Sequence, residues 1–186
     1  LTRLKLQLAL LKQQDLAKKM SEDIVEMERM LNEYLEFSRH QKNEETETVD
    51  IKNIIDEVVI KYENNKIFTK VEKNLKINIR PNSIKRCLTN LIDNSLSYGK
   101  KVEILSNETK DNILIIVDDD GPGIDKKEYQ NVMKPFYRID KSRGQNKSGV
   151  GLGLSISNDI IRAHGGSISL DESPLNGLRV KIYLPL

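Results

Sequence analysis

The chain has 186 residues, which is enough for one domain with a hydrophobic core and an additional helical element. Its 38% hydrophobic and 31% charged residues are typical of a soluble protein. The net charge of +2 gives no electrostatic case for binding nucleic acid or a membrane surface. The single cysteine, Cys87, excludes an internal disulfide and fits a reducing compartment. Its apolar neighbours favour a buried core thiol.

The sequence also bears on membrane association. No apolar run approaches the roughly 18 residues that a membrane span requires, and no signal peptide is visible. The chain begins with Leu1 and not with Met, which indicates a piece of a longer protein. The absence of a span therefore says nothing about the parent protein.

Residues 1–42 are expected to form two helices with a break near Asp15 to Ser21. Apolar residues recur there at spacings of three and four, first at Leu1, Leu4, Leu8 and Leu11, then at Met20, Ile24, Met27, Leu31 and Tyr34. Two short amphipathic helices cannot bury both apolar stripes alone. We therefore expect a helical hairpin that forms a homodimer through a four-helix bundle. The alternative is that both stripes pack on the rest of the chain.

Residues 43–49, NEETETV, are polar and acidic and predict a linker, and an α+β domain is expected over 50–186. Its first helix begins after Asp50 as the N-cap, and a second runs from Pro81 to about Ser97. A third follows GVGLGLSI and ends at His164. Strands are expected at 67–71, 75–79, 101–106, 112–118, 167–171 and 178–184. This order predicts helices packed over one sheet.

Three local motifs indicate possible ligand chemistry. The first is GVGLGL, Gly149 to Leu154. Glycines let the backbone approach phosphate oxygens, and a following helix N-terminus offers free N–H groups. The preceding residues form a loop and not a strand, and no Lys-Ser/Thr follows, so dinucleotide-fold and Walker A interpretations both fail. A helix-opening loop without a ligand stays open as an alternative.

The second motif is NLIDNSLSY, in which Asn90 and Asn94 lie one helical turn apart on one face. Asparagine is a poor helix former, so two in register suggest a function. A carboxamide oxygen can bind Mg²⁺, and its NH₂ group can donate to a phosphate. Two solvated polar residues are the alternative.

The third motif is DDDGPGI, Asp118 to Ile124, directly after an apolar run. A calcium loop places its ligands at alternate positions, whereas neighbouring carboxylates in a strand point to opposite faces. A plain turn explains the glycines but not the carboxylates. In a nucleotide pocket, one Asp would accept a hydrogen bond from an exocyclic amine while Gly121 and Gly123 let the base lie against the backbone.

Basic residues follow at Lys134, Arg138, Lys141, Arg143 and Lys147. Beside a triphosphate they would form a mobile clamp, and a solvated basic loop is the alternative. The two histidines, His40 and His164, are expected to be structural or solvated.

Taken in order, NLIDN, DDGPGI, KPFYR and GVGLGL resemble the N, G1, F and G2 boxes of bacterial sensor histidine kinases. These belong to the ATP-binding superfamily shared with type II topoisomerases, heat-shock chaperones and mismatch-repair proteins. LTRLKLQLALL resembles the first helix of the kinase dimerisation domain, just after the phosphoacceptor His. SIKRCLTNLIDNSLSYG and DDGPGI are most similar to the EnvZ-type osmosensor branch. The resemblance covers essentially the whole chain.

The resemblance implies a Bergerat-type α/β sandwich, that is, a mixed sheet covered by helices, preceded by a dimerisation hairpin. It also implies ATP and Mg²⁺ as cofactors, a response-regulator receiver domain as partner, and a cytoplasmic position in a membrane-anchored inner-membrane receptor. Asn94 would hold Mg²⁺ with help from Asn90, Asp119 would read the adenine amine, and Arg138 would act with Asn94 in catalysis. The other residues implied in nucleotide binding are Tyr98, Gly121, Gly123, Phe136, Lys141, Arg143, Lys147, Gly149, Gly151, Leu152 and Gly153.

Two features depart from the family pattern. Ser97 stands where many relatives carry Lys or Arg, so phosphate contact there would fall to Lys141, Arg143 or Lys147. The acceptor His would lie six residues upstream of Leu1, outside this sequence. The sequence thus predicts the ATP-binding half of a protein-histidine kinase. The alternatives are a superfamily ATPase, a serine kinase of the anti-sigma type, and an inactive dimerisation module.

Overall fold

The structure is a computed structural model that describes residues 44–62, 66–72, 74–139 and 151–186, with scattered positions between 18 and 31. Those scattered positions are helical, but the expected hairpin as a whole lies outside the described residues. The chain divides into two compact units, Leu1–Asn43 and Glu44–Leu186. Among the described residues, no helix is both long and apolar enough to cross a membrane.

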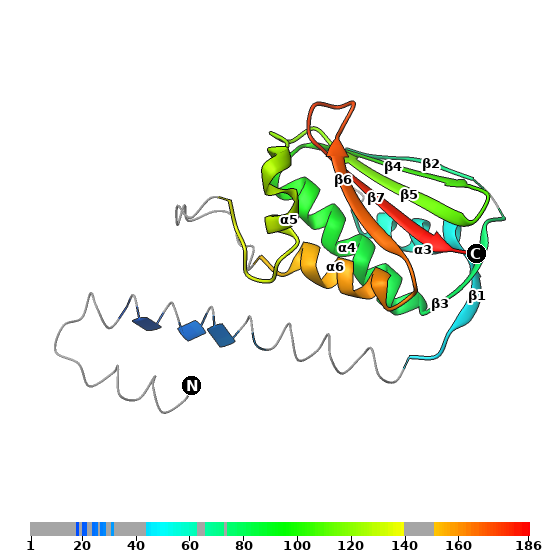
Figure 1. Ribbon diagram of the computed structural model, residues 1–186, viewed down its shortest axis with the longest axis horizontal. Coiled ribbons are helices and arrows are strands. Elements are labelled where there is room, and N and C mark those ends of the chain that lie inside the picture. The colour runs from blue at the N-terminus through cyan, green and yellow to red at the C-terminus, as the bar shows by residue number, and fades with distance from the viewer. Residues whose placement is uncertain are drawn as a thin grey trace. The chain divides into compact units, whose positions relative to one another are not determined.

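The second unit is built on a five-stranded mixed sheet with the order β2-β4-β5-β7-β6 (Figure 1). Strand β2 pairs with β4 in parallel, and the other neighbours are antiparallel. The strand bounds are Lys66–Val71 for β2, Lys101–Glu108 for β4, Asn112–Asp119 for β5, Ser167–Glu172 for β6 and Leu178–Pro185 for β7. A separate two-stranded sheet joins β1 (Glu47–Asp50) to β3 (Lys76–Ile79).

Helices cover one face of the large sheet (Figure 1). Helix α4 (Pro81–Tyr98) packs on β4 and β5, and α6 (Gly153–Arg162) packs on β6, β7 and α4. Helix α3 (Ile51–Val59) packs against α4 and continues into the 3₁₀ turn η1 (Ile60–Tyr62). The short segments η2 (Lys126–Glu128) and α5 (Tyr129–Val132) follow β5.

The core lies between the sheet and these helices. Alternate residues of the central strands point inward, as a one-sided sheet requires, and the helices contribute mainly Ile and Leu. Cys87 is fully buried in α4, as the sequence predicted, and burial raises the pKa of its thiol to about 12. The largest fully buried side chains are Ile51, Ile55, Ile79, Ile84, Leu88, Leu91, Ile92, Ile104, Ile113, Ile115, Ile160 and Ile161.

The starts of α3 and α4 follow from local chemistry. The Asp50 side chain accepts a hydrogen bond from Lys52 N at 2.9 Å, which confirms it as the N-cap of α3. Helix α4 begins with Pro81, but its N-cap residue, Arg80, provides no side-chain cap. The carboxylate of Glu44 takes that place, accepting bonds from Asn82 N at 2.5 Å and from Ser83 N at 3.0 Å.

The expected α+β fold with a helix-covered mixed sheet is confirmed, and every helix and strand predicted after Asp50 is present. The expected linker at 43–49 needs a correction. Residues 47–49 belong to β1, where Glu47 pairs with Ile79 and Val49 pairs with Ile77. The acidic composition hid this strand, because a half-exposed edge strand tolerates polar side chains. The short segments η2 and α5 were not predicted.

Candidate functional site

The end of strand β5 places Asp119 in a buried polar position, with 4% of the residue exposed. Its Oδ1 accepts hydrogen bonds from Gly121 N at 2.9 Å and from Leu178 N at 3.0 Å. Both bonds go to the same oxygen, so Oδ2 is used by neither. A carboxylate that is fixed through Oδ1 can accept a hydrogen bond from a ligand amine at Oδ2.

Gly177, in the turn that leads into β7, lies directly against Asp119. A Cβ at Gly177 would overlap both Oδ1 and the carbonyl oxygen of Asp119, and would lie 2.6 Å from Gly121 N. Sequence reasoning did not select this residue. The available signal was the Asn176-Gly177 pair between two predicted strands, which is typical of a hairpin turn.

The other two carboxylates of the motif have separate partners. Asp118 is fully buried and forms an ion pair with Arg179 of β7. Asp120 is exposed, and its Oδ1 accepts hydrogen bonds from Lys100 N at 2.6 Å and Lys101 N at 2.8 Å. These backbone donors, Lys101 first, hold the pKa of Asp120 below its ordinary value. The three carboxylates therefore do not converge on one point.

The N-terminal end of α6 meets the middle of α4 at Asn90. A Cβ at Gly153 would lie 3.8 Å from both Asn90 Cβ and Asn90 O. Within the described part of the chain, Asn90 Nδ2 is a buried donor without a hydrogen-bond partner. A buried unpaired donor is costly, so a ligand acceptor at this position would remove a penalty. Asn94 lies one turn further along α4 and is partly exposed.

A backbone hydrogen bond joins Phe136 to Gly151. Phe136 N donates to Gly151 O at 2.9 Å, and both residues have a positive φ, 64° and 75°. A Cβ at Gly151 would lie 2.7 Å from Tyr137 O and 3.3 Å from Arg138 Cγ. The two flanks of residues 140–150 are thus joined, and Phe136 is 56% exposed. A positive φ is uncommon for a non-glycine residue such as Phe136, and it indicates that the surrounding structure holds the backbone in this conformation.

The structure therefore brings the predicted residues into groups. Asp119, Gly121 and Tyr98 lie together, because a Cβ at Gly121 would be 3.4 Å from Tyr98 Cβ. Gly123 faces the turn at Gly177, with a Cβ-to-oxygen distance of 3.5 Å. Other groups are Asn90 with Gly153, and Phe136 and Arg138 with Gly151.

Some predicted residues are placed differently or not described. Leu152 is 2% exposed, so its side chain belongs to the core and any ligand contact would run through its backbone. Ser97 Oγ donates to Asp93 O within α4, at 2.7 Å. Lys141, Arg143, Lys147, Gly149 and His40 lie outside the described residues.

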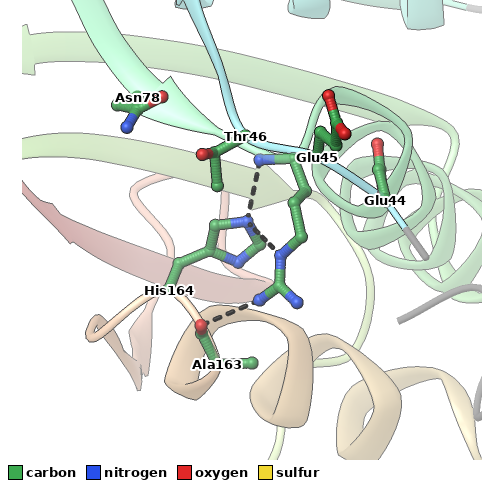
Figure 2. Close-up of a pocket in the computed structure, with 7 residues that line it drawn as sticks. Glu44, Glu45, Thr46, Asn78, Ala163 and His164 are labelled. Atoms are coloured by element: carbon green, nitrogen blue, oxygen red, sulfur yellow. Dashed lines mark hydrogen bonds between the residues drawn. The ribbon is translucent and has the colours of Figure 1, made fainter. Parts of the chain in front are cut away.

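A separate open cavity of about 720 Å³ lies at the other end of α4 (Figure 2). In this cavity, His164 Nε2 accepts a hydrogen bond from Arg80 N at 3.1 Å, and Arg80 Nη2 donates to Ala163 O at 2.8 Å. Arg80 precedes α4, whereas Tyr98 ends it, so the cavity lies about 25 Å from the Tyr98 end. None of the residues that line this cavity is one of the predicted nucleotide residues.

The described residues contain no group of three or more His, Cys, Asp or Glu that could hold a metal ion. Mg²⁺ is commonly held by one or two protein oxygens together with substrate phosphates and water.

Comparison with known proteins identifies the family. Residues 79–186 match the family described as histidine kinase-, DNA gyrase B-, and HSP90-like ATPase. The chain belongs to this family. The resemblance to sensor histidine kinases is confirmed, while the EnvZ-type branch stays a prediction.

Two curated relatives are similar over the full chain. One is the sensor histidine kinase CpxA of Escherichia coli K12, with 35% identity over 204 aligned residues, and the other is GtrS of Pseudomonas aeruginosa, with 31% over 187. The chain spans only 44% and 39% of their lengths. The nucleotide-free catalytic domain of the histidine kinase ThkA has 25% identity and a TM-score of 0.67, covering 76% of this chain and 95% of that domain.

Proposed function

We propose that this chain is the ATP- and Mg²⁺-binding catalytic core of a sensor histidine kinase. The observation that carries the proposal is the Asp119 carboxylate, which is buried and fixed through one oxygen while the other is used by neither backbone bond. The family membership and the buried unpaired donor at Asn90 support it.

In this proposal each end of the nucleotide has its own residues. Asp119 Oδ2 accepts a hydrogen bond from the adenine amine, and Gly121 and Gly123 let the base approach the backbone. Asn90 Nδ2 donates to a phosphate oxygen, and the Asn94 carboxamide oxygen holds Mg²⁺. Bound there, Mg²⁺ would supply positive charge next to the phosphates. The glycines at 149, 151 and 153 approach the phosphates through their backbone, and Arg138, Lys141, Arg143 and Lys147 supply positive charge.

The reaction is phosphoryl transfer from ATP to a histidine that precedes this sequence in the parent protein. The imidazole nitrogen forms a bond to the γ-phosphorus, while the bond between that phosphorus and the ADP oxygen breaks. Positioning and charge neutralisation account for most of the acceleration in such reactions. The phosphoryl group then passes to an aspartate of a response-regulator receiver domain. Residues 1–42 form the homodimer, and the parent protein is an inner-membrane receptor with this part in the cytoplasm.

Calorimetry with Mg-ATP tests the proposal through two substitutions. Asp119→Ala removes the acceptor and should weaken ATP by about tenfold to a hundredfold, as expected for a hydrogen bond to a charged group. Asp119→Asn is the more specific test. Its carbonyl oxygen can still accept the hydrogen bonds from Gly121 N and Leu178 N, while an NH₂ donor replaces the acceptor Oδ2. It should lose ATP affinity while keeping the thermal stability of the unchanged protein.

The matched control is Asp111→Ala, which removes an exposed carboxylate in the β4–β5 turn. It should leave ATP affinity unchanged. If both Asp119 variants bind ATP as well as the unchanged protein, a different residue reads the base. If the unchanged chain shows no binding and no thermal shift at millimolar Mg-ATP, the nucleotide-insensitive dimerisation module is the better description.

The acceptor proposed here is a histidine outside this sequence, so the chain should bind ATP without stable self-phosphorylation. Both ring nitrogens of His164 are engaged, Nε2 with Arg80 N and Nδ1 with Ile160 O at 2.7 Å. Incubation with γ-labelled ATP should therefore leave no acid-labile label on the chain. Label recovered on His164 or His40 would contradict an upstream acceptor.

A further inference from the structure

Asp120 ties the end of helix α4 to the end of strand β5. Its Oδ1 accepts hydrogen bonds from two consecutive amides, Lys100 N at 2.6 Å and Lys101 N at 2.8 Å. Its own amide donates to Lys101 O at 3.3 Å. Gly99 packs against this carboxylate. A Cβ at Gly99 would lie 2.5 Å from Asp120 Oδ1, so the close approach favours a residue without a side chain.

The turn held in this way immediately follows Tyr98, the last residue of α4. Tyr98 contacts Gly121, where an added Cβ would lie 3.4 Å from both Tyr98 Cβ and Tyr98 C. Gly121 is in turn fixed to Asp119 through its amide at 2.9 Å. Two neighbouring carboxylates thus hold the two segments that meet at Gly121. Asp119 holds the loop after β5, and Asp120 holds the end of α4 against that loop.

We propose that Asp120 is a positioning residue for the adenine end of the site, which keeps Tyr98 against Gly121 by holding the turn at Lys100 and Lys101. This inference rests on the proposed function. Asp120 itself does not contact the base. It restricts where the base can lie, and so contributes to affinity and to discrimination between adenine and other bases.

The chemistry of the contact distinguishes this role from a charge effect. Both donors are backbone N–H groups, so a carboxamide oxygen can replace the carboxylate oxygen. Asp120→Asn should retain the turn, whereas Asp120→Ala should release it. Because Asp120 is exposed, the alanine variant should still fold, which thermal unfolding checks.

The experiment measures the affinity of the full 186-residue chain for Mg-ATP, adenosine and Mg-GTP. Asp120→Ala should weaken ATP and adenosine by a similar factor, about tenfold, because the loss is confined to the base end. The ratio of ATP to GTP affinity should fall, and Asp120→Asn should restore binding to within about threefold. Amide hydrogen exchange at Lys100 and Lys101 should speed up in the alanine variant alone.

Asp50→Ala is the matched control. Asp50 also accepts two backbone hydrogen bonds, from Lys52 N at 2.9 Å and Asn74 N at 3.0 Å, but at the start of α3. It should lower stability without changing base discrimination. The role of Asp120 would be overturned by alanine-variant affinities that match the unchanged protein, by adenosine affinity that stays constant while ATP affinity falls, or by failure of Asn to restore binding. Failure of the unchanged chain to bind any adenine nucleotide would instead overturn the proposed function itself.

Discussion

Arg179 holds the buried carboxylate of Asp118 at two points, with Nε 2.8 Å from Oδ1 and Nη2 2.7 Å from Oδ2. The two residues face each other across β5 and β7. The carboxylate holds the pKa of Arg179 above its ordinary value, so the guanidinium stays charged. This pair joins the two strands one residue before Asp119, and its loss should affect both stability and the nearby site.

Replacement of Arg179 by Met should destabilise the domain by about 3 kcal/mol, because it leaves a buried carboxylate without its partner. Urea unfolding would measure the change. The double variant Arg179→Met with Asp118→Leu should recover most of the loss, because no unpaired charge remains. Equal instability of the single and double variants would show that the pair does not matter.

Gly177→Ala should damage the candidate site through lack of space. The new Cβ would overlap Asp119, and overpacking of this kind typically costs about 1–3 kcal/mol. ATP affinity should fall together with thermal stability. Gly165→Ala is the control, because Gly165 has a φ of 74° and nothing nearer than 3.5 Å, so it carries backbone strain alone. It should lose stability but bind ATP normally.

Glu44→Ala should weaken the N-terminus of α4. The carboxylate of Glu44 accepts three hydrogen bonds there, including one from Ser83 Oγ at 2.6 Å, and it sits at the positive end of the helix dipole. Loss of such a cap costs about 1 kcal/mol. Thermal unfolding should show the loss for Glu44→Ala and not for Glu45→Ala, its exposed neighbour. Equal melting temperatures for the two variants would contradict the capping role.

Stability should depend on pH through His164. Burial, with the charge of Arg80, holds the pKa of His164 below its ordinary value, although Ile160 O and the charge of Glu44 act in the opposite direction. The unfolded chain therefore takes up a proton at higher pH than the folded chain does. The contribution of neutral His164 is complete above pH about 6.5 and is lost as the pH falls below it.

Urea unfolding at pH 7.5 and 5.5 would measure that dependence. His164→Gln keeps a side-chain acceptor for Arg80 but does not titrate, so the difference between the two pH values should shrink. An unchanged difference would assign the pH dependence to other groups.

The sequence allowed much of the fold to be predicted, for reasons that are local. Pro81 and an apolar face predict helix α4, and the apolar run NILIIV predicts strand β5. The candidate residues could also be selected, because Asp119 and its glycines follow a strand directly. These signals need no knowledge of distant partners.

What could not be predicted depends on contacts between distant residues. Glu44 caps a helix that begins 37 positions later in the chain, and nothing near Glu44 indicates this. Strand β1 exists because β3 pairs with it, although its own sequence is acidic. The three neighbouring carboxylates differ in role because their partners differ. Arg179 pairs with Asp118, Leu178 N donates to one oxygen of Asp119, and Lys100 N donates to Asp120. None of these partners has a recognisable local pattern.

The topology has a consequence for synthesis of the protein. Strand β7 lies between β5 and β6 and is the last strand of this unit to leave the ribosome. At about 5–20 residues per second, several seconds separate the appearance of β5 from that of β7. During that interval the apolar strand β5 has an unpaired edge, which is a template for wrong pairing. A nascent chain that stops before Leu178 should therefore be prone to aggregate and to need a chaperone.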